Sequence, residues 1–440
     1  MSILYTPAGD TDPIRDFYDG AILHIIRTYR PSMVRIFLSA EMVKKEETRQ
    51  VYSKAIAYNA PDCKIEFIKT DIVDAQLMEK LIPLAEGFME LRKEYPNEEI
   101  LLNLSSGTPQ MKTIMSFLAT DFDNVRAIQV DSPQQGSNRK AHATQDDEDI
   151  IAVIENNFDN VEDYKCRCHE APLALLRRYS IRHQLISLVN SYEYSAALSL
   201  YNKNKLFFAE ETGKLLLHAD LRSKLQVNEA FKVTGKPLNN DKEVKLLNEF
   251  FMVMELRQKK GDLAEFIVKL TPFLYGLLLY YFEHKAAIKP AQFCYEKQRS
   301  NASWKICRGK LQDVAPKAWQ YLNDLMFNYG GFRDKTDLSF SNMLNILHTL
   351  DGVDSQLLEV LDVLRDVERN HRNNLAHTIT NITEELLKNT EPKLSSQELV
   401  QKLRKAFMLI MQGENVYKRN VYDDLNQKIA ASLDEFRQIK

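Results

Sequence analysis

In the first 130 residues, two periodicities alternate. Short apolar runs of strand length occupy residues 2–6, 33–40, 64–68, 100–106 and 126–131. The amphipathic stretches between them, which have helical spacing, occupy residues 13–29, 41–58, 74–95 and 109–122. Asp12 and Pro13 are expected to open the first helix, as N-cap and first helical residue. Strand–helix alternation requires right-handed crossovers and predicts an α/β, Rossmann-like domain with a mainly parallel sheet.

The remainder of the chain has a different pattern. From about residue 170 onward, apolar residues recur every three to four positions, which predicts an all-α region. Residues 141–164 carry eight acidic residues and no Lys or Arg, which is typical of a solvated linker holding a short helix or strand. We therefore predict an α/β domain, an acidic linker, a middle helical domain and a terminal helical bundle, at residues 1–140, 141–169, 170–270 and 271–440.

Composition excludes several classes of protein. The formal net charge of −3 excludes a generally basic nucleic-acid coat, so any nucleic-acid contact must be local. Five cysteines form no disulfide-like framework, and no second pair completes a zinc site with Cys166, Cys168 and His169. We expect plain linker cysteines there and no metal. The chain shows no signal peptide and no run of about 18 apolar residues, so we expect a cytoplasmic protein without a membrane partner.

Small and polar residues follow the predicted strands at the edge where parallel sheets bind ligands. They are Thr6, Gly9 and Asp10 after the first strand, Ser39 after the second, and Ser105, Ser106, Gly107, Thr108, Gln110 and Lys112 after the fourth. Hydroxyl groups and free amides at a helix start suit a phosphate or a ribose, although a capped turn without ligand needs the same residues. The glycine motifs of dinucleotide-binding and P-loop domains are absent, so an ordinary nucleotide enzyme is disfavoured.

The segment "HRNNLAH" (371–377) lies in a long amphipathic stretch and contains R-N-x-x-A-H, from Arg372 to His377. Histidine can transfer protons near neutral pH and arginine can stabilise a phosphorane, so the pair suits metal-independent RNA cleavage. Positions 372 and 377 lie about 140° apart around a straight helix, so one helix presents the pair poorly. Two copies that meet at a two-fold axis would build a joint site. The pair Arg178 and His183 has the same spacing without the Asn and Ala, and Arg178 is expected to face solvent.

With these features the chain resembles the CARF–HEPN ancillary ribonucleases of type III-A CRISPR systems. The R-N-x-x-A-H segment in a terminal helical bundle is similar to the HEPN ribonuclease domain. The front domain with its "SSGTPQMK" turn (105–112) is similar to the CARF sensor domain. The resemblance implies a homodimer that binds a cyclic oligoadenylate made by the type III interference complex, and then cuts single-stranded RNA non-specifically in antiviral defence. It also implies that some members degrade their own activator.

The resemblance assigns roles to residues of this chain. Arg372 and His377 match the catalytic motif and Asn373 its usual neighbour, whereas the ten strand-end residues from Thr6 to Lys112 fall on the loops that hold the ring. Arg369 and His371 are either accessory RNA contacts or structural residues. The activator is expected to be the hexaadenylate rather than the tetraadenylate. The alternative function is a ligand-sensing CARF dimer whose helical half is a non-catalytic dimerisation platform.

Overall fold

The structure is a computed structural model that describes residues 2–133, 149–234, 242–296, 303–377 and 381–435, without the side chains of Lys242 and of residues 372–377. It contains two compact units, Met1–Ile181 and Arg182–Lys440, and each is described by itself. The boundary falls within helix α7 (Ala174–Asn190). The four domain limits given above stay predictions.

The first unit is built on a six-stranded sheet in the order β5-β4-β1-β6-β7-β8. Its strands are β1 (Ser2–Pro7), β4 (Met33–Leu38), β5 (Lys64–Lys69), β6 (Glu99–Asn103), β7 (Val125–Val130) and β8 (Cys168–Glu170). The first five are parallel, and β8 pairs antiparallel with β7. The Rossmann-like architecture and all five expected strands are confirmed.

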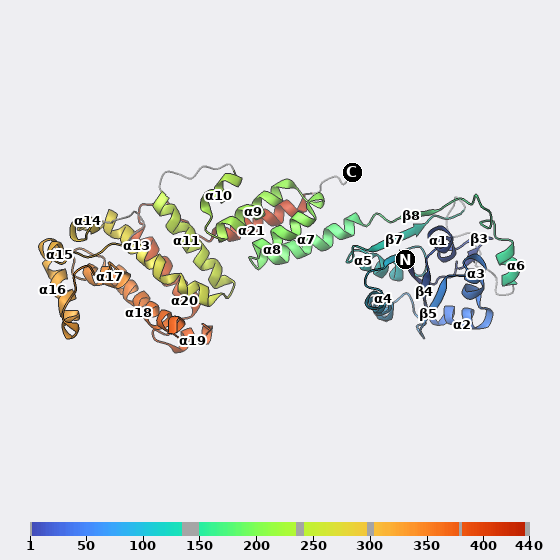
Figure 1. Ribbon diagram of the computed structural model, residues 1–440, viewed down its shortest axis with the longest axis horizontal. Coiled ribbons are helices and arrows are strands. Elements are labelled where there is room, and N and C mark those ends of the chain that lie inside the picture. The colour runs from blue at the N-terminus through green and yellow to red at the C-terminus, as the bar shows by residue number, and fades with distance from the viewer. Residues whose placement is uncertain (1, 134–148, 235–241, 297–302, 378–380, 436–440) are drawn as a thin grey trace. The chain divides into compact units, whose positions relative to one another are not determined.

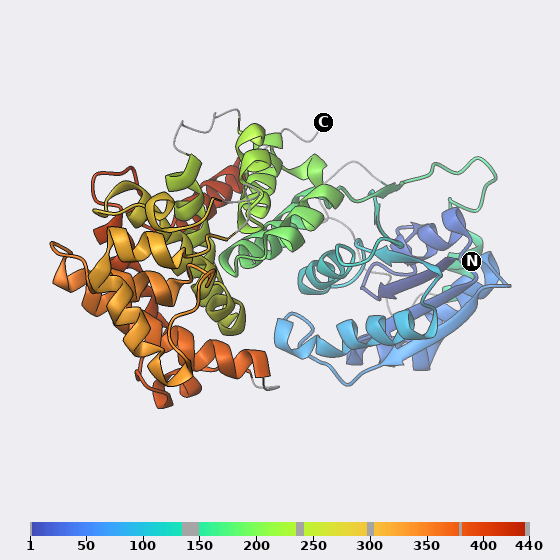
Figure 2. The ribbon, with the colours of Figure 1, turned by 60° about the vertical axis from the view of Figure 1, so that its left-hand side comes forward.

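Helices cover both faces of this sheet (Figures 1 and 2). One face packs against α1 (Ala21–Tyr29), α2 (Ala40–Arg49), α3 (Val51–Asn59) and α6 (Ile150–Glu155). The other packs against α4 (Ile82–Glu94), preceded by the turn η1 (Met78–Lys80), and α5 (Pro109–Leu118). Along β1, Leu4 enters the first core, whereas Ile3 and Tyr5 enter the second. This alternation explains why the strands read as continuous apolar runs.

The first helix begins later than expected, and the prediction that Asp12 and Pro13 open it is wrong. Residues 14–19 form a short hairpin of β2 (Ile14–Arg15) and β3 (Tyr18–Asp19), and α1 starts at Ala21. Asp12 still caps that helix from a distance, because its Oδ1 accepts a hydrogen bond from the Ile22 amide at 3.1 Å. Its Oδ2 accepts another from the Gly9 amide at 3.1 Å.

The described part of the acidic segment packs onto the sheet. Ile150, Val153 and Ile154 of α6 join the first core. Asp159 is buried, where it accepts hydrogen bonds from the Arg167 guanidinium at 2.7 Å and from the Asp19 amide at 2.8 Å. Burial of this carboxylate is tolerated because a cation and an amide pair with it. Residues 149–170 therefore belong to the first unit.

The second unit is all-α where the structure describes it, apart from two isolated β-bridges, which confirms the expected helical class. Its helices after α7 are α8 (Tyr194–Lys203), α9 (Glu210–Ser223), α10 (Val227–Val233), α11 (Lys242–Lys259), α12 (Leu263–Val268), α13 (Leu270–His284), α14 (Pro290–Phe293), α15 (Arg308–Val314), α16 (Pro316–Leu325), α17 (Phe340–Leu347), α18 (Ser355–His377), α19 (Glu384–Asn389), α20 (Ser396–Ile410) and α21 (Val421–Asp434), with 3-10 turns η3 (Lys205–Phe207) and η4 (Phe327–Tyr329). The last helix, α21, returns to pack against α9, and the Thr212 hydroxyl bonds that of Ser432 at 2.9 Å (Figure 1).

Helix α13 lies at the centre of this bundle. Phe273 stacks on Phe251 at 5.4 Å between ring centroids and contacts Phe407 at 5.9 Å. By length and composition, Leu263–His284 could cross a membrane, with a mean hydropathy of 1.5, yet half of that window is buried inside the protein. Its apolar character is accounted for by its place in the core.

Arg178 does not face solvent, so that expectation is wrong: its exposed fraction is 1%. It lies on α7 at the same spacing as the buried Ile181, Leu185 and Val189, which places it on the apolar stripe of the helix. A long side chain on such a stripe can bury its methylenes while its guanidinium reaches a partner.

A buried ion pair joins α9 to α11 in the second unit. Arg222 and Glu249 form two hydrogen bonds of 2.8 and 2.6 Å, and their side chains are 6% and 0% exposed. The Tyr417 hydroxyl donates to the same carboxylate at 3.0 Å. Removal of one partner would leave an uncompensated buried charge.

We expect Arg222→Ala to lower the free energy of unfolding by about 3–5 kcal/mol. Urea unfolding followed by tryptophan fluorescence tests this, because both tryptophans, Trp304 and Trp319, lie in the second unit. Lys317→Ala is the control: its pair with Asp351 is 74% and 94% exposed, so it should change stability by less than about 0.5 kcal/mol. Equal midpoints for the two variants would contradict the role of the buried pair.

Candidate functional site

The sheet of the first unit reverses its order of strand addition between β1 and β6, which is where ligands bind in open α/β sheets. The loops after these two strands approach closely. A Cβ on Gly9 would lie 2.7 Å from the Gly107 amide nitrogen. Gly107 has a φ of +78°, and a Cβ there would lie 2.8 Å from the Met111 sulfur. Both positions therefore require glycine.

A cavity of about 730 Å³ opens beside this contact. Five of the ten predicted ring-binding residues line it, namely Gly9, Asp10, Ser105, Gly107 and Lys112. Other lining residues include Thr11, Arg15, Asp19, Gly20, Gln129, Asp131, Ser132 and Arg167. The cavity lining thus combines three cations and three aspartates with backbone groups and hydroxyls. The cations, amides and hydroxyls are the groups that bind a phosphorylated ligand.

The other five predicted residues do not line the cavity. Thr6 and Ser106 are buried and accept hydrogen bonds from the Asn103 amide at 3.0 and 2.7 Å. Ser39 is buried at the start of α2. Thr108 caps α5 by accepting from the Met111 amide, and its hydroxyl donates to the Ala75 carbonyl at 2.9 Å. Gln110 has a buried Oε1 with no hydrogen-bond partner among the described residues. These five residues therefore support the loops without facing the cavity.

Lys112 is one of the three cations that line the cavity. Burial lowers the pKa of its ammonium group, and the nearby Asp12 carboxylate opposes that shift. Burial in turn raises the pKa of Asp12, whereas hydrogen bonds from Ser106, Ile22 and Gly9 lower it. A partly desolvated ammonium group is weakly hydrated, so an incoming phosphate displaces little water from it.

Arg167 was missed by the sequence analysis. It comes from the segment before β8, and its guanidinium donates to the Asp131 carbonyl at 3.1 Å, the Asp19 carbonyl at 3.1 Å and the Asp159 carboxylate. Arg167, which lines the cavity, therefore ties it to β3 and to the loop after β7. Only its isolated position in a Cys-Arg-Cys sequence could have marked it beforehand, and that signal is weak.

The cysteines beside Arg167 lie within 4.8 Å of His24, rather than in a set with His169. His24 is already engaged, because its Nε2 accepts from the Arg167 amide at 2.9 Å and its Nδ1 lies 3.4 Å from the Asp19 carboxylate. His169 is half exposed and lies 3.7 Å from Asp131. His24 thus holds the backbone of Arg167, whereas both cysteine sulfurs lie against the Thr28 hydroxyl.

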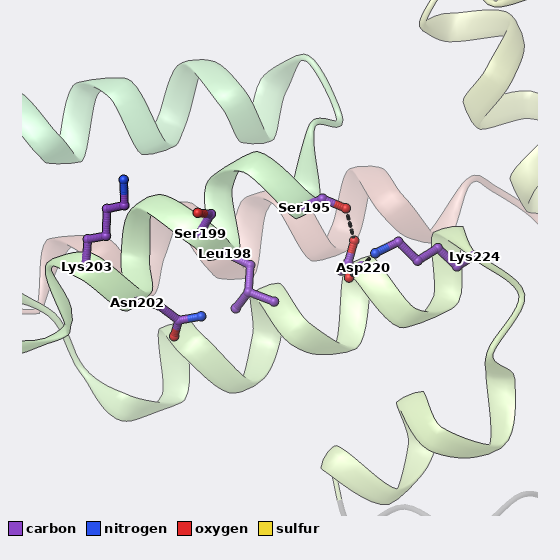
Figure 3. A pocket seen from close by; sticks show the side chains of 7 residues that line it. All are labelled: Ser195, Leu198, Ser199, Asn202, Lys203, Asp220 and Lys224. Atoms are coloured by element: carbon purple, nitrogen blue, oxygen red, sulfur yellow. Dashed lines mark hydrogen bonds and ion pairs between the residues drawn. The ribbon is translucent and has the colours of Figure 1, made fainter.

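A second hollow, of about 490 Å³, lies between α8 and α9 in the other unit (Figure 3). Its acidic residue, Asp220, accepts hydrogen bonds from the Ser195 hydroxyl and from the Lys224 ammonium group. The remaining lining residues are Leu198, Ser199, Asn202 and Lys203. Since its carboxylate is already paired, this hollow is a weaker candidate than the cavity at the sheet edge.

The R-N-x-x-A-H segment forms the last turns of α18, which is described to His377. The side chains of Arg372, Asn373 and His377 lie outside the described residues. The turn before them is anchored: Glu368 is buried, accepts from the Thr271 hydroxyl of α13 at 2.8 Å and pairs with Arg365. This contact fixes the helix that carries the motif against the centre of the bundle.

The two residues that flank the motif differ. Arg369 is exposed and lies 3.3 Å from Asp366. His371 is buried, with an exposed fraction of 1%, and burial lowers the pKa of its ring. Its Nδ1 has no hydrogen-bond partner among the described residues. The burial of His371 fits a structural residue, and an RNA contact by Arg369 stays a prediction.

Three family models match successive parts of the chain. The Cas_Csm6 CARF domain matches residues 64–168, the CRISPR-associated protein Csm6 6H domain residues 171–223, and the Cas_Csm6 HEPN domain residues 236–430. The chain belongs to the Csm6 family. The suspected resemblance to CARF–HEPN ribonucleases is therefore confirmed.

Csm6 relatives span nearly the whole chain. The CRISPR system endoribonuclease Csm6 of Streptococcus thermophilus is 29% identical and covers 99% of this chain and 100% of the relative. The CRISPR system endoribonuclease Csm6 of Enterococcus italicus is 27% identical, and the match covers 84% of this chain and 91% of the relative. A solved structure titled "Enterococcus italicus Csm6 bound to cyclic hexa-2'-fluoro-hexa-dAMP" has a TM-score of 0.68 at 22% identity and covers 98% and 100%. This last likeness establishes a shared fold.

The predicted ring-binding role of the cavity at the sheet edge can be tested by pH. We expect Lys112→Ala to weaken binding of cyclic hexaadenylate about tenfold, because a charge-assisted bond to phosphate is lost. Since burial lowers the pKa of Lys112, wild-type affinity should fall as the pH rises into the alkaline range. Lys112→Arg, which stays charged, should resist that fall. Calorimetry at several pH values measures both.

Thr108→Ala is the matched control for Lys112. It removes a helix cap on the same turn and should cost about 1 kcal/mol of stability with little effect on ring affinity. Unaltered affinity in Lys112→Ala would place the ring elsewhere.

Proposed function

We propose that this Csm6 protein is a metal-independent endoribonuclease that a cyclic oligoadenylate activates. The observation that carries the proposal is the R-N-x-x-A-H segment at the end of α18, inside the part of the chain that matches the HEPN domain. Its curated relatives are named endoribonucleases. The substrate is single-stranded RNA cut without sequence specificity, in type III CRISPR defence.

The residue types of the motif account for the chemistry. His377 takes the proton of a ribose 2′-hydroxyl or gives one to the leaving 5′-oxygen, and Arg372 stabilises charge on the phosphorane. Asn373 orients the histidine or the phosphate. Attack by the 2′-oxygen on its own phosphate leaves a 2′,3′-cyclic phosphate and a free 5′-hydroxyl. Protein groups supply both proton transfer and charge stabilisation, so no metal ion is assigned to the reaction.

The activator is proposed to bind the cavity at the edge of the sheet. The E. italicus relative was solved with a cyclic hexa-nucleotide analogue, which favours the hexaadenylate here. Lys112 and Arg15 line the cavity and can meet its phosphates, whereas Arg167 supports the cavity through hydrogen bonds to protein groups. A ring on the two-fold axis of a dimer would use each copy of these residues once. Slow cleavage of the ring at this or the HEPN site is part of the proposal.

The functional unit is proposed to be a cytoplasmic homodimer. Positions 372 and 377 lie about 140° apart on α18, so a joint site needs the second copy. The rival function, a sensor with a non-catalytic helical platform, gives no reason for an intact Arg372 and His377 pair. RNA cleavage with and without the ring separates the two.

Replacement of Arg372 or His377 by Ala should abolish RNA cleavage while ring binding stays intact. The products of the wild-type enzyme should carry a 2′,3′-cyclic phosphate, and EDTA should not inhibit. Cleavage of a labelled RNA with cyclic hexaadenylate present, analysed by mass spectrometry, measures both. Full activity in the His377→Ala variant would contradict the proposed catalytic site.

A mixing experiment tests assembly. Wild-type protein is mixed with an excess of Arg372→Ala/His377→Ala protein, and activated cleavage per wild-type chain should fall because most wild-type chains then sit in mixed dimers. The Lys317→Ala protein, which keeps the motif, is the control and should cause no such fall. A monomer by light scattering that still cleaves RNA when activated would contradict the joint site.

A further inference from the structure

One surface of the second unit presents aromatic side chains to solvent. Phe327 and Tyr329 of η4 are 74% and 76% exposed, and Tyr321 and Leu325 of α16 are 41% and 49% exposed. We name these four residues, with Arg308, Arg333 and Lys335, the α16–η4 surface. A run of large exposed apolar groups of this kind is typical of a binding surface rather than of chance exposure.

The turn that carries the aromatic residues is well built. The Tyr329 and Gly331 amides both donate to the Met326 carbonyl at 2.9 Å. Behind them the Phe332 ring is buried and contacts Trp319 at 6.1 Å between centroids. Phe327 and Tyr329 are therefore held outward by a defined turn, and their ordering on binding costs little entropy.

The segment that carries these rings is locally basic. Residues 303–337 contain six Lys or Arg against four Asp, in a chain whose net charge is −3. The Arg308 guanidinium lies 4.8 Å from the centroid of the Trp319 ring, and the Lys335 ammonium 5.8 Å from that of Tyr295. Arg333 is exposed. A protein partner with an apolar face would have to bury these charges, whereas a polyanion would pair with them.

We propose that the α16–η4 surface binds single-stranded RNA, an inference that rests on the proposed ribonuclease function. Unpaired bases stack on Phe327 and Tyr329, and Arg333 and Lys335 contact phosphates. Helix α17 packs against both α16 and α18, so the surface and the motif belong to one bundle. RNA held here has a raised local concentration at the motif, which acts on KM rather than on kcat.

The first test uses Phe327→Leu/Tyr329→Leu, which keeps apolar bulk but removes stacking. With cyclic hexaadenylate present, KM for an RNA of about 20 nucleotides should rise about tenfold, whereas kcat and the activator requirement stay unchanged. An RNA of about 5 nucleotides has few bases left to stack outside the cleavage site, so its KM should change much less. Phe327→Tyr/Tyr329→Phe should restore the KM for the longer RNA.

Leu206→Ala is the matched control. Leu206 is an apolar side chain of the same unit that is 79% exposed, outside the α16–η4 surface. This variant should behave as wild type with both RNAs. An equal rise of KM in Leu206→Ala would show a general loss of apolar surface, and would overturn the proposal.

The second test measures RNA binding without cleavage, in the Arg372→Ala/His377→Ala background, by fluorescence anisotropy. Arg333→Ala/Lys335→Ala should weaken binding and reduce the slope of log affinity against log salt by about 1–2. This measurement does not depend on the proposed function. A wild-type protein that binds RNA at this surface but never cleaves it would contradict the ribonuclease function and support the RNA-binding surface.

Two results would overturn the proposal. One is an unchanged KM and an unchanged RNA affinity in the Phe327→Leu/Tyr329→Leu variant. The other is a change in the mass of the protein by light scattering, with RNA affinity intact, since the surface would then be an interface between copies of the chain.

Discussion

The backbone contact between Gly9 and Gly107 is the constraint on which the sensor half depends. It exists because neither residue has a Cβ, and it lets the loops after β1 and β6 meet where the strand order reverses. Asp12 holds one loop through the Gly9 amide and holds the first turn of α1 through Ile22. One buried carboxylate thus links the loop, the helix and the Ser106 turn. A ligand that touches any of the three acts on all of them.

The second unit uses buried polar pairs to fix helices around an aromatic core. Arg222 and Glu249 join α9 to α11, and Glu368 joins α18 to α13 through Thr271. Such pairs add little net stability compared with apolar packing, but they penalise any arrangement that separates the partners. They therefore suit a unit that has a small number of defined states. A ligand that prefers the active state a hundredfold supplies roughly 2.7 kcal/mol of bias between such states.

Local periodicity was enough to predict the five parallel strands, because the central strands bury both faces and read as apolar runs, and the partly exposed edge strand β5 still carries Ile65, Phe67 and Ile68. It could not predict β8, where Cys168–Glu170 pairs through its backbone and carries no apolar pattern. Helix α1 starts late because a hairpin precedes it. In that hairpin Asp16 and Phe17 have φ values of +48° and +61°, and no sequence pattern indicated these values. Arg167 was missed, and Arg178 was expected at the surface, for one reason. A buried arginine is allowed only by partners distant in the sequence, so single-sequence reasoning places it on the surface.

The two halves of the proposed mechanism call for different kinds of site. An activator that is scarce needs a concave site with desolvated cations such as Lys112, because affinity there comes from few, strong contacts. A substrate that is any single strand needs the opposite: exposed rings and solvated cations, which bind many sequences weakly and release products quickly. The cavity at the sheet edge and the α16–η4 surface have these contrasting properties. Different residues bind the activator and the substrate. Control by the activator can therefore be strict while the choice of substrate stays broad.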